Sequence, residues 1–264
     1  MRFSMALRWI FPPLLILFHL CGLHGLTQGS EACREREPAV LKSAKSMVQS
    51  TWPIRSTHDP VSRFIESLGR RLVEGVCPGE SLAWSFHVIR DLDLKAFSVK
   101  GCSVFVSDGA VVSVGSESEL AAVLAHEIGH HLAGHFLDSE NSGGPRLGNN
   151  LFVFFSEMGA STRDAATITT GSLKQIDSPQ REYEADEQAV VVLHRSEYNP
   201  QGLLDLIHRL RQGGTLSHPS ERISRIEKLL ERKIPGGRYI SDSDSFRKIR
   251  DKIQKDWKDL DLCP

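Results

Sequence analysis

Apolar residues recur at helical spacing over most of the chain, and this pattern predicts a largely helical protein. The pattern is helical from 38 to 76, and its best-defined part is an amphipathic face that follows Asp59 and Pro60. These two residues are expected as the cap and the first-turn residue of that helix. Further helices are expected over 119–136, 151–158, 179–194, 200–211, 219–233 and 245–258.

Strand signals are concentrated just before the helix expected over 119–136. Residues 84–90 alternate in places between apolar and polar side chains, and residues 103–107 (SVFVS) are rich in β-branched and aromatic types. The Asp-Gly pair at 108–109 is a common hairpin turn, so residues 110–114 are expected to form a second strand. The fold class that follows is α+β, mostly helical with a small antiparallel sheet packed on the 119–136 helix.

The first residues of the chain have the order of a secretory signal peptide. Arg2 and Arg8 precede an apolar run over 9–20, and small and polar residues fill 22–30. The run is shorter than the roughly 20 residues that span a bilayer as a helix. We therefore expect residues 1–30 to be a signal peptide, cleaved between 22 and 30, and the protein to be periplasmic or secreted. An uncleaved membrane anchor is the alternative.

Chain length and charge restrict the protein further. Residues 31–264 are expected to form a single domain, with a core over about 60–235 and a C-terminal helical extension. The 32 basic and 33 acidic residues nearly cancel, to a net charge of -1. No broad field of one sign results, so nucleic acid is not expected as a partner.

The cysteine count agrees with export. Beyond Cys21, four cysteines follow in the chain, and an even number in an exported protein is typical of disulfide bonds. We favour the pairs Cys77–Cys102 and Cys33–Cys263, with four buried thiols as the alternative.

The segment 125–131, Ala-His-Glu-Ile-Gly-His-His, contains the pattern HExxH. On a helix, His126 and His130 lie on one face, so both rings can bind one metal ion, and two imidazoles at this spacing suit zinc. Glu127 stands on the same turn, where it can take a proton from a zinc-bound water. The alternative is an ordinary surface helix, but the apolar neighbours indicate burial, which is costly for such a cluster without a metal. Gly129 would allow another backbone to approach closely.

A catalytic zinc site needs a third protein ligand. The extended motif HExxHxxGxxH is not met, because the glycine and the third histidine are each displaced by one position. The segment 181–186, Arg-Glu-Tyr-Glu-Ala-Asp, offers Glu182 instead. Asp186 lies on the same helical face and could hold a ligating histidine by a hydrogen bond. Glu184 competes as ligand but is out of phase with Asp186.

The two motifs together resemble the gluzincin zinc metallopeptidases, the family that includes the CAAX prenyl proteases and the HtpX-like and Oma-like quality-control proteases. The similarity runs from about 64 to 226 and includes VFVSDG at 104–109. It implies a zincin-like fold with one zinc ion per chain. The site residues that it implies are the ligands His126, His130 and Glu182, the general base Glu127, and Asp186 as support of a ligand.

A His-Pro pair followed by an arginine is a further feature of this family. His218 and Pro219 match the pair, whereas Arg222 and Arg225 are both near but stand at other spacings than expected. The resemblance implies that His218 is either a catalytic donor to the oxyanion or an inhibitory fourth ligand. Two more histidines are expected to pack or to form local hydrogen bonds: His131 and His135.

These features predict a zinc-dependent metalloendopeptidase that acts on exported proteins in a misfolded or unfolded state. Its partners would be protein or peptide substrates, held by strand addition along 102–114 and with Tyr183 as a further oxyanion donor, and peripheral association with membrane proteins is compatible with this role. The Gly-rich region 138–178 is interpreted as a lid. The alternative is a chaperone-like or autoinhibited zinc-binding relative with little proteolytic activity.

Overall fold

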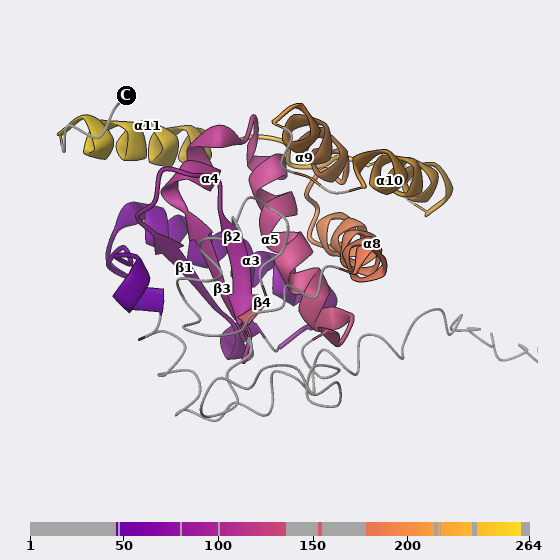
Figure 1. Cartoon of the computed structure of the whole chain (residues 1–264), viewed down its shortest axis with the longest axis horizontal. Coiled ribbons are helices and arrows are strands. Elements are labelled where there is room, and N and C mark those ends of the chain that lie inside the picture. The colour runs from indigo at the N-terminus through magenta and orange to yellow at the C-terminus, as the bar shows by residue number, and fades with distance from the viewer. Residues whose placement is uncertain are drawn as a thin grey trace, which may run out of the picture.

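A computed structural model shows a mostly helical α+β protein with a small sheet (Figure 1). The residues that it describes are 46, 48–79, 81–99, 101–135, 153–154, 178–213, 216, 218–233 and 237–259. The α-helices are α3 (Pro60–Val76), α4 (Asp108–Ser113), α5 (Glu117–Leu132), α8 (Pro179–Arg195), α9 (Gln201–Gln212), α10 (Pro219–Lys233) and α11 (Asp244–Asp259). The strands are β1 (Ser85–Ile89), β2 (Ala96–Val99), β3 (Ser103–Ser107) and β4 (Val153–Phe154).

The helices expected from the apolar pattern are largely confirmed. Helices α8 to α11 agree with their predicted ranges to within one residue at each end, and α5 ends four residues earlier than expected. Helix α3 begins as predicted, with Pro60 in its first turn and the Asp59 side chain accepting from the Val61 amide. The stretch before it is not continuously helical, because Pro53 and Pro60 push the residues preceding them out of the helical region.

The sheet is mixed rather than antiparallel, which corrects the prediction. Its strand order is β1-β3-β2-β4. Strand β2 runs antiparallel to both β3 and β4, but β1 runs parallel to β3. The reason is that β3 returns from β2 into the place beside β1, and this second reversal restores the direction of β1. Because β3 has a neighbour on each side, it offers no free edge, and the predicted strand addition along 102–114 is wrong.

The hairpin expected at Asp108 is also wrong, since this residue opens helix α4. Ser107 is the N-cap, and its Oγ accepts from the Ala110 amide at 2.9 Å. Gly109 is needed for packing, because a Cβ there would meet the Leu92 carbonyl oxygen at 2.1 Å. In the region 151–158, expected as a helix, Val153–Phe154 form strand β4; the remainder, like most of the predicted lid, lies outside the described residues.

Helix α5 is the centre of the molecule, and all of its residues are buried. It packs against α8, α9 and α3 and lies on the sheet at β2 and β3 (Figure 1). The packing of the sheet on the motif helix is therefore confirmed. Among the helices that the structure describes, none combines the length and the apolarity needed to cross a membrane.

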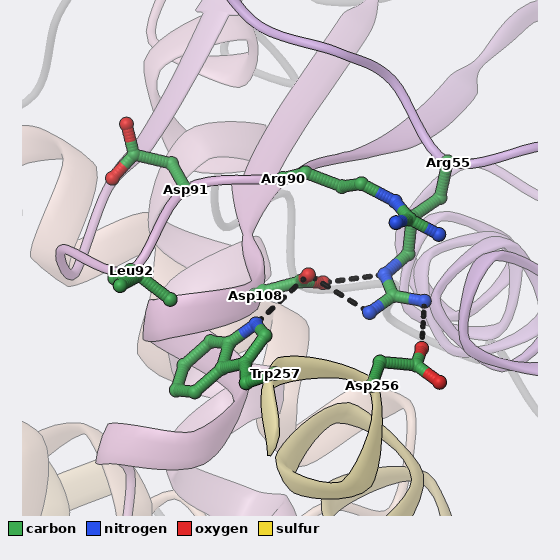
Figure 2. A pocket seen from close by; sticks show the side chains of 7 residues that line it. All are labelled: Arg55, Arg90, Asp91, Leu92, Asp108, Asp256 and Trp257. Atoms are coloured by element: carbon green, nitrogen blue, oxygen red, sulfur yellow. Dashed lines mark hydrogen bonds and ion pairs between the residues drawn. The ribbon is translucent and has the colours of Figure 1, made fainter. Parts of the chain in front are cut away.

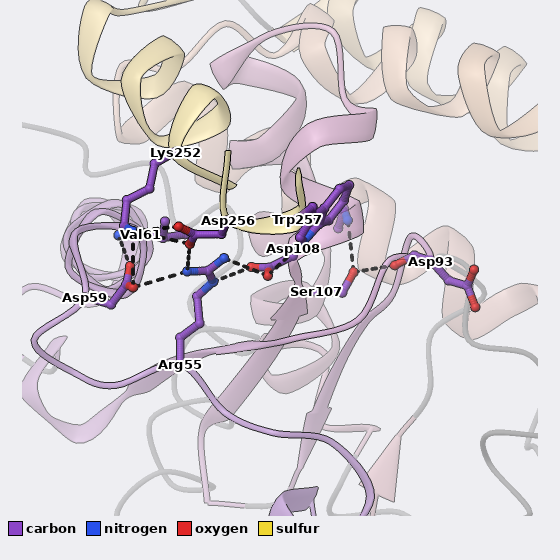
Figure 3. Close-up of polar contacts among 10 residues, drawn as sticks. Arg55, Asp59, Val61, Asp93, Ser107, Asp108, Lys252, Asp256 and Trp257 are labelled. Carbon is purple, nitrogen blue, oxygen red and sulfur yellow. Dashed lines mark hydrogen bonds and ion pairs between the residues drawn. The ribbon is translucent and has the colours of Figure 1, made fainter. Parts of the chain in front are cut away.

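Arg55, which precedes α3, joins the start of α4 to the C-terminal helix α11 (Figure 3). Its guanidinium donates to both oxygens of Asp108, at 2.6 and 2.8 Å, and to Asp256 at 2.7 Å. A weaker bond of 3.2 Å reaches Asp59. Arg55 and Asp108 are both buried and line a small pocket with Trp257 of α11, whose ring nitrogen lies 3.4 Å from Asp108 (Figure 2). Arg55 thus links the segment that precedes α3 to α11, the helix that follows α10.

The predicted pairing of Cys77 with Cys102 is wrong, because the Cys77 sulfur takes part in no disulfide. Cys77 is the C-cap of α3, whereas the Cys102 sulfur lies in the turn between β2 and β3, 3.8 Å from Nδ1 of His131. The pair Cys33–Cys263 lies outside the described residues.

Candidate metal centre

Helix α5 places His126 and His130 on one face, one turn apart. The Nε2 atoms of the two rings are 3.1 Å from each other, and the ring planes are nearly perpendicular, at 87°. Both side chains are fully buried. Two imidazole nitrogens that point at one place inside a protein are the start of a metal site.

Glu182 of helix α8 completes the group. Its Oε2 lies 3.2 Å from Nε2 of His126, and its Oε1 lies 3.5 Å from Nε2 of His130. The two helices approach this closely because of Gly129, where a Cβ would meet the Ala185 carbonyl oxygen at 2.5 Å. The predicted close approach at Gly129 and the predicted grouping of the three side chains are both confirmed.

The geometry of the three groups fits zinc. Zinc bonds of 2.0–2.1 Å at tetrahedral angles set neighbouring ligand atoms about 3.3 Å apart. The distances among these three side chains lie on either side of that value. Among the described residues, Oε2 of Glu182 is buried without a hydrogen bond, as expected for an oxygen directed at a metal position. Two histidines and a glutamate are also a ligand set of catalytic zinc sites, with a fourth position left for water.

Asp186 holds His126 from behind, as predicted. Its Oδ1 lies 3.0 Å from Nδ1 of His126, which leaves Nε2 of that ring directed at the metal position. Burial alone would lower the pKa of His126, but the hydrogen bond with Asp186 and the nearby negative charges of Glu182 and Asp186 outweigh it and raise the pKa to about 9. The surroundings of this ring therefore favour positive charge, as a cation site requires.

Arg222 of helix α10 is a residue whose role the sequence left open. It is fully buried and donates to both oxygens of Asp186, each at 2.7 Å, and its Nη1 lies 3.4 Å from Oε2 of Glu182. Burial would raise the pKa of Asp186, but Arg222 and His126 hold it below its ordinary value. The signal was present in the sequence: Arg222 lies one turn into the helix that Pro219 opens, but the spacing alone did not separate it from Arg225.

Glu127, the predicted general base, is fully buried on α5. Ser98 of strand β2 donates from its Oγ to Oε2 of Glu127 at 2.8 Å. The sheet thus supplies a hydrogen-bond donor to this carboxylate. Ser98 was not identified from the sequence, since one serine in a short buried strand carries no signal of its own.

The remaining histidines of the motif helix have local partners, as expected. His131 packs edge-on against Trp84, with ring centroids 4.9 Å apart, and burial lowers its pKa to about 3. His135 follows α5, and its Nδ1 lies 2.8 Å from Nδ1 of His130. Its other nitrogen, Nε2, lies 3.1 Å from Oε2 of Glu184. Glu184 is therefore a partner of His135 in this structure.

Among the described residues, the potential ligand atoms of His126, His130 and Glu182 all lie within 4.8 Å of one another. His218 is not part of this group. It is exposed, directly before α10, and has a left-handed backbone with φ of 49°. Tyr183 lies under the guanidinium of Arg225, 4.4 Å from its ring centroid. The catalytic or inhibitory role of His218 stays a prediction.

The sequence is similar to those of known proteins. The sequence profile of Peptidase family M48 matches residues 61–233. The beta-barrel assembly-enhancing protease of Escherichia coli (strain K12) is 28% identical over 220 residues, which cover 78% of this chain and 43% of that protein. The mitochondrial metalloendopeptidase OMA1 of Schizosaccharomyces pombe is 28% identical over 186 residues, 66% of this chain and 54% of that protein. The chain spans about half the length of the curated relatives that it matches.

The region matched by the family profile covers well over half of the chain and holds the whole candidate site, from Ser98 to Arg222. The resemblance stated from the two motifs is confirmed by this match. The chain therefore belongs to peptidase family M48, a family of zinc-dependent metallopeptidases.

Proposed function

We propose that this chain is a zinc metalloendopeptidase that hydrolyses peptide bonds in misfolded or unfolded exported proteins. The observation that supports this most is the convergence of helices α5 and α8 on one candidate metal position, with the buried Glu127 next to His126 on α5. The ligands would be His126, His130 and Glu182. A structural zinc site would fill the fourth position with another protein ligand, whereas a catalytic site keeps it for water.

Glu127 would act as the general base. When bound, zinc supplies Lewis-acid polarisation of the scissile carbonyl and lowers the pKa of water. Glu127 takes the proton of the attacking water and later delivers it to the leaving amine. The hydrogen bond from Ser98 fixes the orientation of this carboxylate. Tyr183 or His218 would stabilise the oxyanion as a donor.

The proposed substrates and location rest on the relatives and on the first residues of the chain. One relative is named for beta-barrel assembly and another for the mitochondrion, which supports proteins associated with membranes as substrates. The order of charged, apolar and small residues over 1–30 supports removal of a signal peptide and a periplasmic or secreted product. Residues 31–264 would then belong to the mature enzyme, as part of one domain. N-terminal sequencing of the exported protein tests this.

Cleavage of unfolded casein by the wild type and by Glu127→Gln tests the activity, with zinc content measured for both proteins. The variant keeps the metal ligands, so we expect equal zinc content and a loss of cleavage of about 10²-fold or more. Equal cleavage by the two proteins would refute the peptidase assignment. Zinc binding and casein binding without cleavage by either protein would show the chaperone-like alternative.

His218→Ala separates the two roles proposed for His218. A gain of cleavage over the wild type identifies an inhibitory ligand, and a loss with unchanged zinc content identifies an oxyanion donor. Because His218 is exposed, its replacement is expected to leave the fold intact.

A further inference from the structure

We propose that His135 and Glu184 are positioning residues of the zinc site, which hold the ligand His130 in the tautomer and orientation that metal binding needs. This inference rests on the zinc site of the proposed function. It assigns a role to a histidine just beyond the motif helix and to the middle acidic residue of the segment 181–186.

The three side chains form a continuous chain of hydrogen bonds whose direction is fixed at both ends. A His130 ring that binds metal through Nε2 must carry its proton on Nδ1, so Nδ1 is a donor. Nδ1 of His135, 2.8 Å away, must then accept, which leaves the proton of this neutral ring on Nε2. Nε2 of His135 therefore donates to the carboxylate of Glu184, at 3.1 Å. Each donor in the chain meets an acceptor.

The backbone places His135 for this contact. Helix α5 ends at Leu132, and Gly134 adopts a left-handed conformation with φ of 74°. A left-handed residue just after a helix reverses the direction of the chain, and glycine takes this conformation without strain because it has no side chain. The reversal returns His135 towards the last turn of α5, where its ring is 99% buried beside His130. Its carbonyl oxygen also accepts from Arg181 of α8 at 3.3 Å.

Glu184 is supported from its own helix, since Gln180 donates to its other oxygen at 2.9 Å. Helix α8 thus serves both histidines with alternate acidic residues. Glu182 faces the metal position, Asp186 supports His126 directly, and Glu184 supports His130 through His135. Supporting partners of metal-bound histidines affect metal affinity by about 10- to 100-fold.

Zinc affinity tests the proposal, measured by competition with a chromogenic chelator on the full chain. His135→Phe keeps a buried ring but cannot accept from His130, and we expect a 10- to 100-fold weaker zinc affinity. His135→Gln can accept and donate through one amide, so it should retain most of the affinity. Glu184→Ala, at a half-exposed position, should weaken zinc about threefold to tenfold, because water replaces part of the contact.

His131→Phe is the matched control. His131 is a buried histidine of the same helix that packs on Trp84, so its replacement should change thermal stability but not zinc affinity. The proposal is overturned if His135→Phe, or Glu184→Ala where the former does not fold, binds zinc within twofold of the wild type. It is overturned equally if His135→Gln is as weak as His135→Phe, which would show a packing role. Absence of zinc binding by the wild type would instead overturn the proposed function.

Discussion

Replacement of Arg55 by methionine tests whether the contact between the N-terminal flank and α11 stabilises the whole domain. Methionine keeps much of the apolar stem but removes the bonds to Asp108, Asp256 and Asp59 (Figure 3). The largest effect is expected at Asp108, whose side chain is 1% exposed. Among the hydrogen bonds described for it, only the long contact with Trp257 would remain. The carboxylate would then be buried without the cation that is hydrogen-bonded to it.

The expected cost follows from this burial. Removing one partner of a buried ion pair typically destabilises a protein by about 3–5 kcal/mol. The bonds to Asp256 and Asp59 add little, since these carboxylates are partly exposed and regain water. For a domain of this size each kcal/mol shifts Tm by about 2–4 °C, so a fall of roughly 6–20 °C is expected.

The loss should depend on pH in a direction that identifies Asp108. Burial raises the pKa of this carboxyl above its ordinary value, and the pairing with Arg55 opposes the rise. Without Arg55 the pKa rises further, so the folded variant binds a proton more readily than the unfolded chain. The loss of stability of Arg55→Met relative to the wild type is therefore fully present at neutral pH, and it shrinks as the pH falls and Asp108 becomes protonated in the folded variant.

Urea denaturation at pH 7 and pH 5 measures these effects, with Arg55→Met/Asp108→Asn as the second variant. The double variant lacks the stranded charge and should be more stable than the single one. Arg63→Met, at an exposed position of α3, is the control and should change stability by at most about 0.5 kcal/mol. A loss below about 1 kcal/mol in Arg55→Met, or no recovery in the double variant, would refute the reasoning.

Three further predictions concern the metal site. In Gly129→Ala the new Cβ would lie 2.5 Å from the Ala185 carbonyl oxygen, so α8 must shift. We expect a stability lower by about 1–3 kcal/mol and weaker zinc binding. An unchanged zinc affinity in the chelator competition would contradict this. Ser98→Ala should lower kcat on a peptide substrate about 10- to 100-fold, with KM and zinc content unchanged. The reason is that Glu127 loses a hydrogen bond of about 1.5–3 kcal/mol. A wild-type kcat would show that this bond is dispensable. Removal of zinc by a chelator should lower Tm, since a ligand present at 1,000 times its Kd stabilises the folded state by about 4 kcal/mol, whereas an unchanged Tm would argue against metal binding by the folded chain.

The sequence by itself determined the ranges of most helices and the three candidate metal ligands of this protein. The ranges of α8 to α11 follow from apolar periodicity and from proline or polar residues at their starts, which act within a few residues of chain. The ligands follow from the same kind of local rule, because residues four apart on a helix share a face. This holds for the candidate ligands His126 and His130, and also for Glu182 and Asp186, the residue that supports His126. The close approach at Gly129 could be anticipated from a glycine in a helix.

The tertiary structure alone decided which distant residues hold Glu127 and Asp186 in place. Ser98 reaches Glu127 from a strand 29 positions away, and Arg222 reaches Asp186 from a helix 36 positions further on. The local pattern gives no signal at Ser98, and it does not separate Arg222 from Arg225. The parallel pairing of β1 with β3 and the helical start at Asp108 were likewise set by the path of the chain and by packing against the Leu92 carbonyl. Local spacing fixes what lies on one helical face, whereas contacts between elements depend on how the whole chain closes around its core.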